Sequence, residues 1–149
     1  MAKRSKNVEL ILEVLKDEVR GDVVSALKKL TKDYSMTWMY TTKKKIFPST
    51  KKDIQAEMRE VYPMKGRQSD IRNIAEGKDV IMIELVESYP DPKTGKVYRT
   101  PLVLVLEMKQ GKIRTGRHYC DPAVSLLHLS KAEVGRAFKK SKGSIEAYG

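Results

Sequence analysis

The sequence predicts a single α+β domain over residues 1–149, in which a curved antiparallel sheet carries helices on one face. Near the N-terminus, apolar residues recur at the spacing of a helix face, whereas later in the chain apolar and polar residues alternate between turn signals. Helices that precede a run of antiparallel strands are typical of α+β domains. The length suffices for one domain with its own core, and we expect residues 1–6 and 140–149 to be mobile tails.

Two helices are expected at the N-terminus. The apolar stripe from Val8 to Val19 has helical spacing, and Asn7 is expected to be its N-cap. Gly21 is expected to end this helix, because glycine readily adopts the left-handed conformation of a helix C-cap. Asp22 is then expected to cap a second, shorter helix.

Two further helices are expected outside the N-terminal pair. One is capped by Ser49 or Thr50 and continues to about Val61, where Pro63 closes it. The other covers residues 130–139 and follows the last strand, so it ends the ordered part of the domain.

Alternating apolar residues predict the strands of the sheet. The segment 65–76 is the weakest candidate, because Ile71 and Ile74 break strict alternation. The segment 97–121 is the strongest and divides into two strands at the tight turn Gln110-Gly111. The expected strands cover residues 34–42, 65–76, 80–89 and 97–121.

The first expected strand carries a row of large side chains. Tyr34, Met36, Trp38 and Tyr40 alternate along it and therefore share one face. Because tryptophan and tyrosine join a large apolar area to a polar tip, this row could form the wall of a pocket. A plain core face is the alternative.

The register of the last hairpins decides which side chains share a face. The segment Lys109-Gln110-Gly111 suits a three-residue loop with a bulge at the glycine. In that register His118 lies opposite Leu102, and the preceding hairpin places Glu87 opposite Thr100. From strand spacings, the Glu87 and His118 backbones would then lie roughly 11–12 Å apart, which suits groups that flank a water or a substrate. A two-residue loop would instead move His118 to the opposite face.

The face that carries Glu87 and His118 has the composition of a small-molecule pocket. It combines apolar walls with one carboxylate, one hydroxyl and one imidazole. Burial is expected to lower the pKa of His118, so this pair suits general acid or base catalysis near neutral pH. The structural alternatives are a hydrogen-bonded core histidine and a glutamate that reaches solvent. The residues on this face are Ile81, Ile83, Leu85, Glu87, Thr100, Leu102, Leu104, Gly116, His118 and Cys120.

The opposite face of the sheet suggests a partner. Glu84 and Arg117 would flank Val103, so a cross-strand charge pair is expected there. The rest of that face is too apolar for free solvent. If helices cover only one side of the sheet, the other side is expected to meet a second subunit in a homodimer.

The net charge of +11 raises nucleic acid as a partner. The lysines gather at residues 3–6, 43–52 and 139–142, which are termini and a loop, so solvated lysines are the simpler interpretation. Phosphate-binding grooves usually add arginine and aromatic residues, and no RNA-recognition, helix-turn-helix or zinc-finger pattern is present. Nucleic acid is therefore not the expected partner, and a lysine-rich binding surface is a third, weaker hypothesis.

Composition also bears on compartment and cofactors. Cys120 is the single cysteine, which excludes an internal disulfide and fits a reducing cytoplasm. The N-terminus lacks the apolar core of a signal peptide, and no apolar run approaches the ~20 residues needed to span a bilayer. Two separated histidines, His118 and His128, do not form a metal site, and His128 has no evident partner. We therefore expect a cytoplasmic protein with no metal, no cofactor and no membrane partner.

The sequence around the last hairpin resembles a known family. The turn Gly111-Lys112-Ile113, followed by a strand that ends in Tyr119-Cys120-Asp121, resembles the SnoaL-like branch of the nuclear-transport-factor-two-like superfamily. The N-terminal helices, the aromatic first strand, the third helix and the strand meander agree with it. The resemblance implies a cone-shaped, cystatin-like α+β barrel with its N-terminal helices on the concave face. It also implies a pocket between sheet and helices, and commonly a homodimer.

Members of this superfamily include limonene-epoxide hydrolase, polyketide cyclases, ketosteroid isomerase relatives and non-catalytic binding domains. In the resemblance to limonene-epoxide hydrolase, Glu87 and His118 take the places of the two catalytic aspartates, and Leu85 takes the place of the arginine between them. Met36 and Trp38 correspond roughly to the tyrosine and asparagine that hold its water. Because one acid is an imidazole and the arginine is absent, the resemblance supports the pocket rather than epoxide hydrolysis.

The predicted function is a cofactor-independent enzyme of isomerase, cyclase, dehydratase or epoxide-hydrolase type. It would act on an apolar cyclic or polyketide-like substrate, with His118 and Glu87 as its acid and base. The alternative is a non-catalytic domain that binds a ligand or forms a dimeric protein-interaction surface. The substrate is expected to lie against Tyr34, Met36, Trp38, Tyr40, Leu85, Thr100, Leu102 and Cys120.

Overall fold

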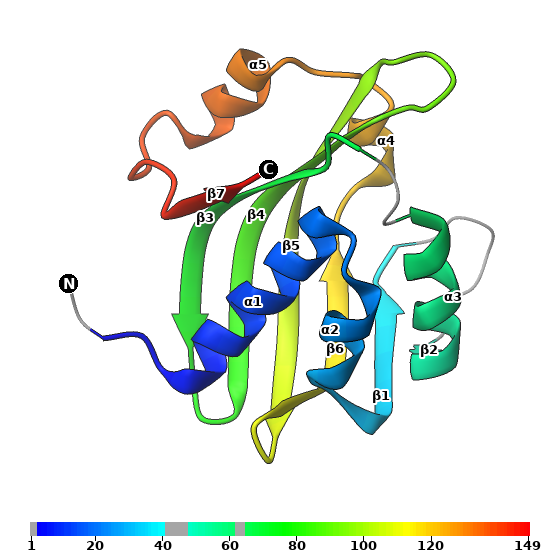
Figure 1. Cartoon of the computed structure of the whole chain (residues 1–149). Coiled ribbons are helices and arrows are strands. Elements are labelled where there is room, and N and C mark those ends of the chain that lie inside the picture. Colours follow the sequence, from blue (N-terminus) through cyan, green and yellow to red (C-terminus); the bar gives the residue numbers. More distant parts are fainter. Residues whose placement is uncertain (1–2, 41–47, 62–64) are drawn as a thin grey trace.

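The computed structural model describes residues 3–40, 48–61 and 65–149, which form one curved sheet with helices packed against it (Figure 1). The seven strands are ordered β2-β1-β6-β5-β4-β3-β7. The strands are β1 (Leu30–Trp38), β2 (Pro48–Thr50), β3 (Gln68–Glu76), β4 (Val80–Pro90), β5 (Val97–Lys109), β6 (Lys112–Tyr119) and β7 (Glu146–Tyr148). The helices are α1 (Lys6–Arg20), α2 (Val23–Lys28), α3 (Lys51–Val61), α4 (Pro122–Ser125) and α5 (Lys131–Gly135), followed by the 3₁₀ helix η1 (Arg136–Phe138). Within the described ranges, no helix is long and apolar enough to cross a membrane.

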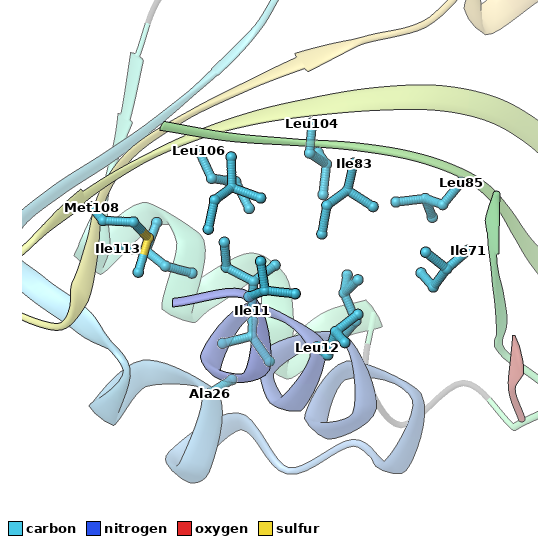
Figure 2. Close-up of a cluster of buried hydrophobic side chains, with 14 of the residues drawn as sticks. Ile11, Leu12, Ala26, Ile71, Ile83, Leu85, Leu104, Leu106, Met108 and Ile113 are labelled. Atoms are coloured by element: carbon cyan, nitrogen blue, oxygen red, sulfur yellow. The ribbon is translucent and has the colours of Figure 1, made fainter. Parts of the chain in front are cut away.

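The N-terminal helices cover the concave face of the sheet, and the predicted α+β class is confirmed. Figure 2 shows Ile11 and Leu12 of α1 pointing towards strand side chains, among them Ile83 and Leu104. Ile11 and Leu12 are 1% exposed, and Ile83 is completely buried. Burial of each such side chain contributes about 1.5–3 kcal/mol, so this cluster is the main source of stability. The core closes the middle of the concave face and leaves the ends of the strands for a site.

The ends of α1 follow the sequence with one difference. Ser5, rather than the predicted Asn7, is the N-cap, because its hydroxyl accepts a hydrogen bond from the Val8 N–H at 3.1 Å. Gly21 adopts a φ of 75° and ends the helix. Asp22 then caps α2 by accepting a hydrogen bond from a backbone N–H. The corner between the two helices is therefore confirmed.

One strand pair departs from the predicted antiparallel sheet. β1 pairs with β6 in parallel, with Trp38 beside His118, while all other recorded pairs are antiparallel. β1 also begins at Leu30, before the predicted start at Tyr34, because Leu30 already pairs with Ile113. Parallel strands are joined by long connections, which local sequence patterns do not reveal.

A bulge in β3 explains the broken alternation of its isoleucines. The register of β3 against β4 shifts at Arg72, so one extra residue lies in β3 at that point. Ile71 and Ile74 consequently both pack against the core, although they are separated by an odd number of positions. The weak strand prediction is confirmed, and its irregularity has a structural cause.

The β5–β6 hairpin has a different loop from the predicted one but keeps the predicted face. Gln110-Gly111 is a two-residue turn with left-handed φ values of 51° and 71°. A bulge at Arg114 then shifts the register by one residue. His118 therefore lies opposite Leu104 instead of Leu102. Because these two leucines are two positions apart, His118 still faces the concave side.

The C-terminal segment covers part of the outer face of the sheet. A capping box between Ser130 and Glu133 begins α5, which confirms the predicted closing helix. Val134 and Phe138 pack against Val86 on the outer side of β4. The sequence predicts a mobile tail beyond this helix, whereas the structure adds β7 to the edge of the sheet beside β3. This long-range pairing has no local signal in the sequence.

The predicted pair of Glu84 and Arg117 on the outer face is wrong. The Asn73 side-chain amide donates a hydrogen bond to Glu84 at 2.5 Å, and Arg117 forms an ion pair with Glu107 at 3.2 Å. The bulge in the β5–β6 hairpin places Arg117 opposite Val105, away from Glu84. Each charged group has therefore found another partner.

Candidate functional site

The predicted site residues fall into two groups on the concave face. Tyr34, Leu85 and Leu102 belong to the closed core, so they pack behind the site rather than line an open surface. The other residues, Thr100 excepted, are half-buried and lie towards the ends of the strands. This second group consists of Met36, Trp38, Tyr40, Glu87, His118 and Cys120.

Strand pairing brings the half-buried group together from several strands. Glu87 pairs with Thr100, as predicted, and Trp38 pairs with His118. Because His118 lies opposite Leu104, further along β5 than Thr100, the Glu87 and His118 backbones are farther apart than the predicted register implied. Burial lowers the pKa of the His118 imidazole, and the Glu87 charge opposes part of that shift. The two groups are therefore electrostatically coupled across the curved sheet.

Glu87 is held by an arginine that the sequence did not reveal. The Arg67 guanidinium donates a hydrogen bond to the Glu87 carboxylate in an ion pair whose side chains are 10% and 17% exposed. Arg67 also lies over the ring of Tyr89, with 5.8 Å between the guanidinium carbon and the ring centroid. The pairing of Ser69 with Glu87 brings Arg67, two positions earlier, beside the carboxylate. The one available signal was the basic residue at the start of β3.

The imidazole of His118 is half-buried, and one of its two ring nitrogens forms no hydrogen bond with the described residues. Its ring makes an edge contact with Tyr40, with 5.6 Å between the ring centroids. Nδ1 is buried and has no hydrogen-bond partner among the described residues. Burial lowers the pKa of His118 below its ordinary value of 6.5, and the Glu87 charge opposes this shift only in part. At neutral pH the ring is therefore neutral and able to accept or deliver a proton.

Cys120 is a poor nucleophile in this environment. Burial raises the pKa of its thiol to about 11, and the charges of Glu87 and Asp121 add to that effect. The thiolate is the reactive form of cysteine, so Cys120 contributes apolar surface next to Glu87. Asp121 caps α4 by accepting a hydrogen bond from the Ala123 N–H at 2.9 Å.

The helix α4 closes one side of the site with a polar contact. The hydroxyls of Thr100 and Ser125 lie 2.5 Å apart and form a hydrogen bond. Thr100 is buried, so its hydroxyl is already satisfied and serves mainly to attach α4 to β5. A substrate that binds the Thr100 hydroxyl, as predicted, would therefore have to replace its hydrogen bond to Ser125.

His128 has partners, contrary to the expectation from sequence. Its Nδ1 lies 3.3 Å from the backbone oxygen of Val97, and its ring centroid lies 4.8 Å from that of Tyr98. The ring of Tyr98 in turn packs against Tyr89 at 5.3 Å. This aromatic row connects the segment after α4 to the Arg67–Glu87 pair.

The arrangement combines a proton acceptor with a fixed negative charge. A neutral imidazole can remove a proton from carbon next to a carbonyl, provided that the resulting imidazolium is stabilised. The Glu87 carboxylate supplies a stabilising charge, and Arg67 holds that carboxylate in place. Across the described parts of the chain, no group of three or more histidine, cysteine, aspartate or glutamate side chains is arranged to hold a metal ion.

Comparison of the fold identifies its class. No family model matches the sequence, and no curated protein matches it. Solved structures do match, and they include NTF2-like proteins and proteins provisionally named polyketide cyclases, one of them SnoaL-like. The chain therefore has the NTF2-like fold, and the resemblance seen in the sequence is confirmed at the level of the fold.

Three of these structures illustrate the likeness. IdmH from Streptomyces antibioticus, provisionally named a polyketide cyclase, has a TM-score of 0.71 at 11% identity over 83% of this chain and 98% of its own. A provisionally named SnoaL-like polyketide cyclase from Jannaschia sp. has a TM-score of 0.68 at 14% identity over 88% and 99%. An NTF2-like protein of unknown function from Cytophaga hutchinsonii has a TM-score of 0.62 at 14% identity over 83% and 96%. At such identities the likeness establishes the fold, and the chemistry must be argued from the site.

Proposed function

We propose that this protein is a cofactor-independent enzyme that moves a proton on an apolar cyclic or polyketide-like carbonyl substrate, as an isomerase, cyclase or dehydratase does. The observation that carries the proposal is the buried Nδ1 of His118, which has no partner among the described residues and lies within the field of Glu87. A buried polar atom without a partner is costly, and a substrate proton would satisfy it.

In the proposed step, the neutral imidazole of His118 removes a proton from the carbon next to the carbonyl. The electron pair of the broken C–H bond moves into an enolate, and the proton stays on His118 as an imidazolium. Glu87 stabilises the imidazolium, and Arg67 keeps the carboxylate in position. In an isomerisation the enolate is conjugated with a second double bond, and the imidazolium returns the proton to the far carbon of that dienolate. In a cyclisation the enolate carbon attacks a second carbonyl, and the alkoxide that forms takes the proton from the imidazolium, which restores the neutral His118.

Hydrogen exchange into the substrate tests this proposal without knowledge of the natural substrate. A panel of cyclic ketones and diketones is incubated with the protein in heavy water, and deuterium uptake next to the carbonyl is followed by NMR. We expect His118→Gln to reduce the uptake rate about 10²–10⁴-fold, as for removal of a general base. Glu87→Gln should also reduce it, while His128→Gln serves as the matched control histidine. Equal uptake by the wild type and by both site variants would refute the catalytic role.

A non-catalytic ligand-binding domain is the second candidate. The ion pair of Glu87 with Arg67 favours it, because the carboxylate already has a cationic partner without a substrate. In that case the wild type would bind members of the ketone panel, and His118→Gln would change their affinity, but neither protein would accelerate deuterium uptake. Deuterium uptake by the substrate panel therefore distinguishes an enzyme from a non-catalytic binding domain.

We also propose that the protein forms a homodimer through the part of the outer sheet face that the C-terminal segment leaves open. Met82 and Tyr119 are 47% and 40% exposed there, which is unusual for large apolar side chains on neighbouring parts of a sheet. Light scattering should give the mass of two chains for the wild type and of one chain for Tyr119→Glu. A wild type that is monomeric at high protein concentration would contradict this proposal.

A further inference from the structure

A cavity lies on the side of the sheet away from the candidate site. It has a volume of about 290 Å³ and is partly open, and it lies between the outer faces of β3, β4 and β5 and the C-terminal segment. Figure 1 shows α5 and β7 together at the β3 end of the sheet, away from α2 and α3. Val86 and Ser88 line this cavity and flank Glu87 in β4, so strand alternation turns them away from the concave face.

The cavity is lined by more positive than negative charge. Arg72, Arg99 and Lys131 contribute cationic side chains, whereas Asp70 is the acidic residue among the lining side chains. The Oδ2 atom of Asp70 lies 3.3 Å from the Arg72 guanidinium, whereas its buried Oδ1 has no hydrogen-bond partner among the described residues. Arg72 is fixed further by a hydrogen bond to the Ser144 hydroxyl at 3.0 Å. The other two cations, Arg99 and Lys131, form no salt bridge with a carboxylate of the described residues.

Among the three cations, Arg99 is the one whose guanidinium lacks both an ion-pair partner and a full set of hydrogen bonds in the described part of the chain. It donates one hydrogen bond to the Leu129 backbone oxygen at 2.8 Å, and it forms no ion pair with any carboxylate in the described part of the chain. Its Nε is buried and lacks a hydrogen-bond partner among the same residues. A partly buried guanidinium without a counter-charge is unfavourable, and a bound carboxylate or phosphate would remove this cost.

The rest of the lining is apolar. Val86, Val134 and Phe138 form a small hydrophobic cluster at the cavity, and Arg72 lies over the Phe138 ring at 4.5 Å. A ligand for this cavity therefore needs an anionic group for the cations and an apolar group for this cluster. The volume is near the lower limit for ligand pockets and fits a single ring or a short chain.

We propose that this cavity is a second ligand site, which binds a small organic anion with an apolar end. The anionic group, a carboxylate or a phosphate monoester, contacts Arg99 and Lys131, and the apolar end packs on Phe138. The site bridges β5 and α5, so an occupied cavity links the sheet to the C-terminal segment. This inference is independent of the proposed catalytic function, because it uses none of the residues on the concave face.

Calorimetric titration of the full chain tests the proposal with three probes of similar shape. Benzoate and phenyl phosphate supply the two anionic groups, and benzamide is the neutral control. We expect saturable binding of at least one anion and none of benzamide, and the stronger anion identifies the preferred group. Arg99→Met should weaken that binding about tenfold, as expected for loss of a charge-assisted hydrogen bond.

Matched variants keep the test decisive. Lys131→Gln changes an exposed side chain on the cavity rim and should weaken binding without affecting the fold, even if Arg99→Met proves unstable. Lys140→Gln removes an exposed lysine from the same segment outside the lining and should leave the affinity unchanged. His118→Gln should also bind normally, which separates this site from the concave one. Absence of binding by both anions, equal binding of benzamide, or unchanged affinity in Lys131→Gln and Arg99→Met would overturn the proposal.

Discussion

His118 owes its chemical character to burial more than to its neighbours. Burial favours the neutral ring, and the nearby Glu87 charge only reduces that preference. A histidine of this kind is neutral at pH 7 and can act as a base, whereas an exposed histidine is partly protonated near neutral pH.

The lowered pKa of His118 predicts a specific pH dependence of stability. The unfolded chain binds a proton at about the ordinary pKa of 6.5, while the folded chain binds it only at lower pH. The contribution of the neutral ring is therefore complete above this value and is lost as the pH falls below it, down through the folded-state pKa. We expect the free energy of unfolding of the wild type to fall relative to His118→Gln between neutral and mildly acidic pH, as measured by urea denaturation. A constant difference, with His128→Gln as the control, would contradict the buried neutral state.

Gly116 shows how a single missing side chain shapes the site. A Cβ at this position would lie 2.6 Å from the terminal methyl of Met36 and 3.1 Å from a methyl of Leu106. We expect Gly116→Ala to reduce the free energy of unfolding by about 1–3 kcal/mol, the usual cost of overpacking. The double variant with Met36→Ala should be less destabilised than the sum of the two single variants, because the clashing methyl is gone. Gly135→Ala, where nothing lies within 4 Å of the added atom, is the control. Additive effects in the double variant would show that the two residues do not compete for space.

At the level of elements, β3 and β4 are joined by more than backbone pairing. The Arg67–Glu87 ion pair ties the start of β3 to the site end of β4, and both side chains are largely buried. Removal of one partner leaves a charge without compensation, which costs more than the pair itself contributes.

This asymmetry can be measured with a double-mutant cycle. We expect Arg67→Met and Glu87→Gln each to lower the free energy of unfolding by about 2 kcal/mol, in line with loss of a charge-assisted hydrogen bond. The double variant should be less destabilised than the sum of the two, because no unpaired charge is left. Arg114→Met and its exposed ion-pair partner Asp33 provide a control cycle with little coupling. Strict additivity at Arg67 and Glu87 would exclude the pair as a structural link.

The elements also show what could be predicted from the sequence. Helix caps and the short turn before β5 act within a few residues, so the Gly21 corner and the Glu87–Thr100 register were correct. The bulge at Arg114 has no distinct local signal in the sequence. The predicted loop therefore put His118 on the correct face of the sheet but opposite Leu102 instead of Leu104. Arg67 was missed because its partner is set by the pairing of β3 with β4 rather than by the residues around it.

On the scale of the whole molecule, one sheet serves two separate surfaces. The concave face is covered by α1 and α2 and carries the candidate site with His118 and Glu87. The outer face is covered in part by the C-terminal segment and borders the cationic cavity. The sequence predicted the first surface because strand alternation separates the faces. It could not predict the second, which depends on β7 joining β3 from the far end of the chain.

The parallel pairing of β1 with β6 has a further consequence for how the chain reaches this structure. We expect Trp38 and His118 to become neighbours after the hairpins from β3 to β6 have formed, because β1 pairs with β6 from far away in the chain. Closing so long a loop early in folding is entropically unfavourable, whereas the hairpins between β3 and β6 join neighbouring segments. We expect folding kinetics to give φ-values near 0 for Met36→Ala in β1 and clearly higher values for Ile83→Val in β4. On this expectation the candidate active site is completed late in folding, and a nascent chain has none until β6 has been synthesised.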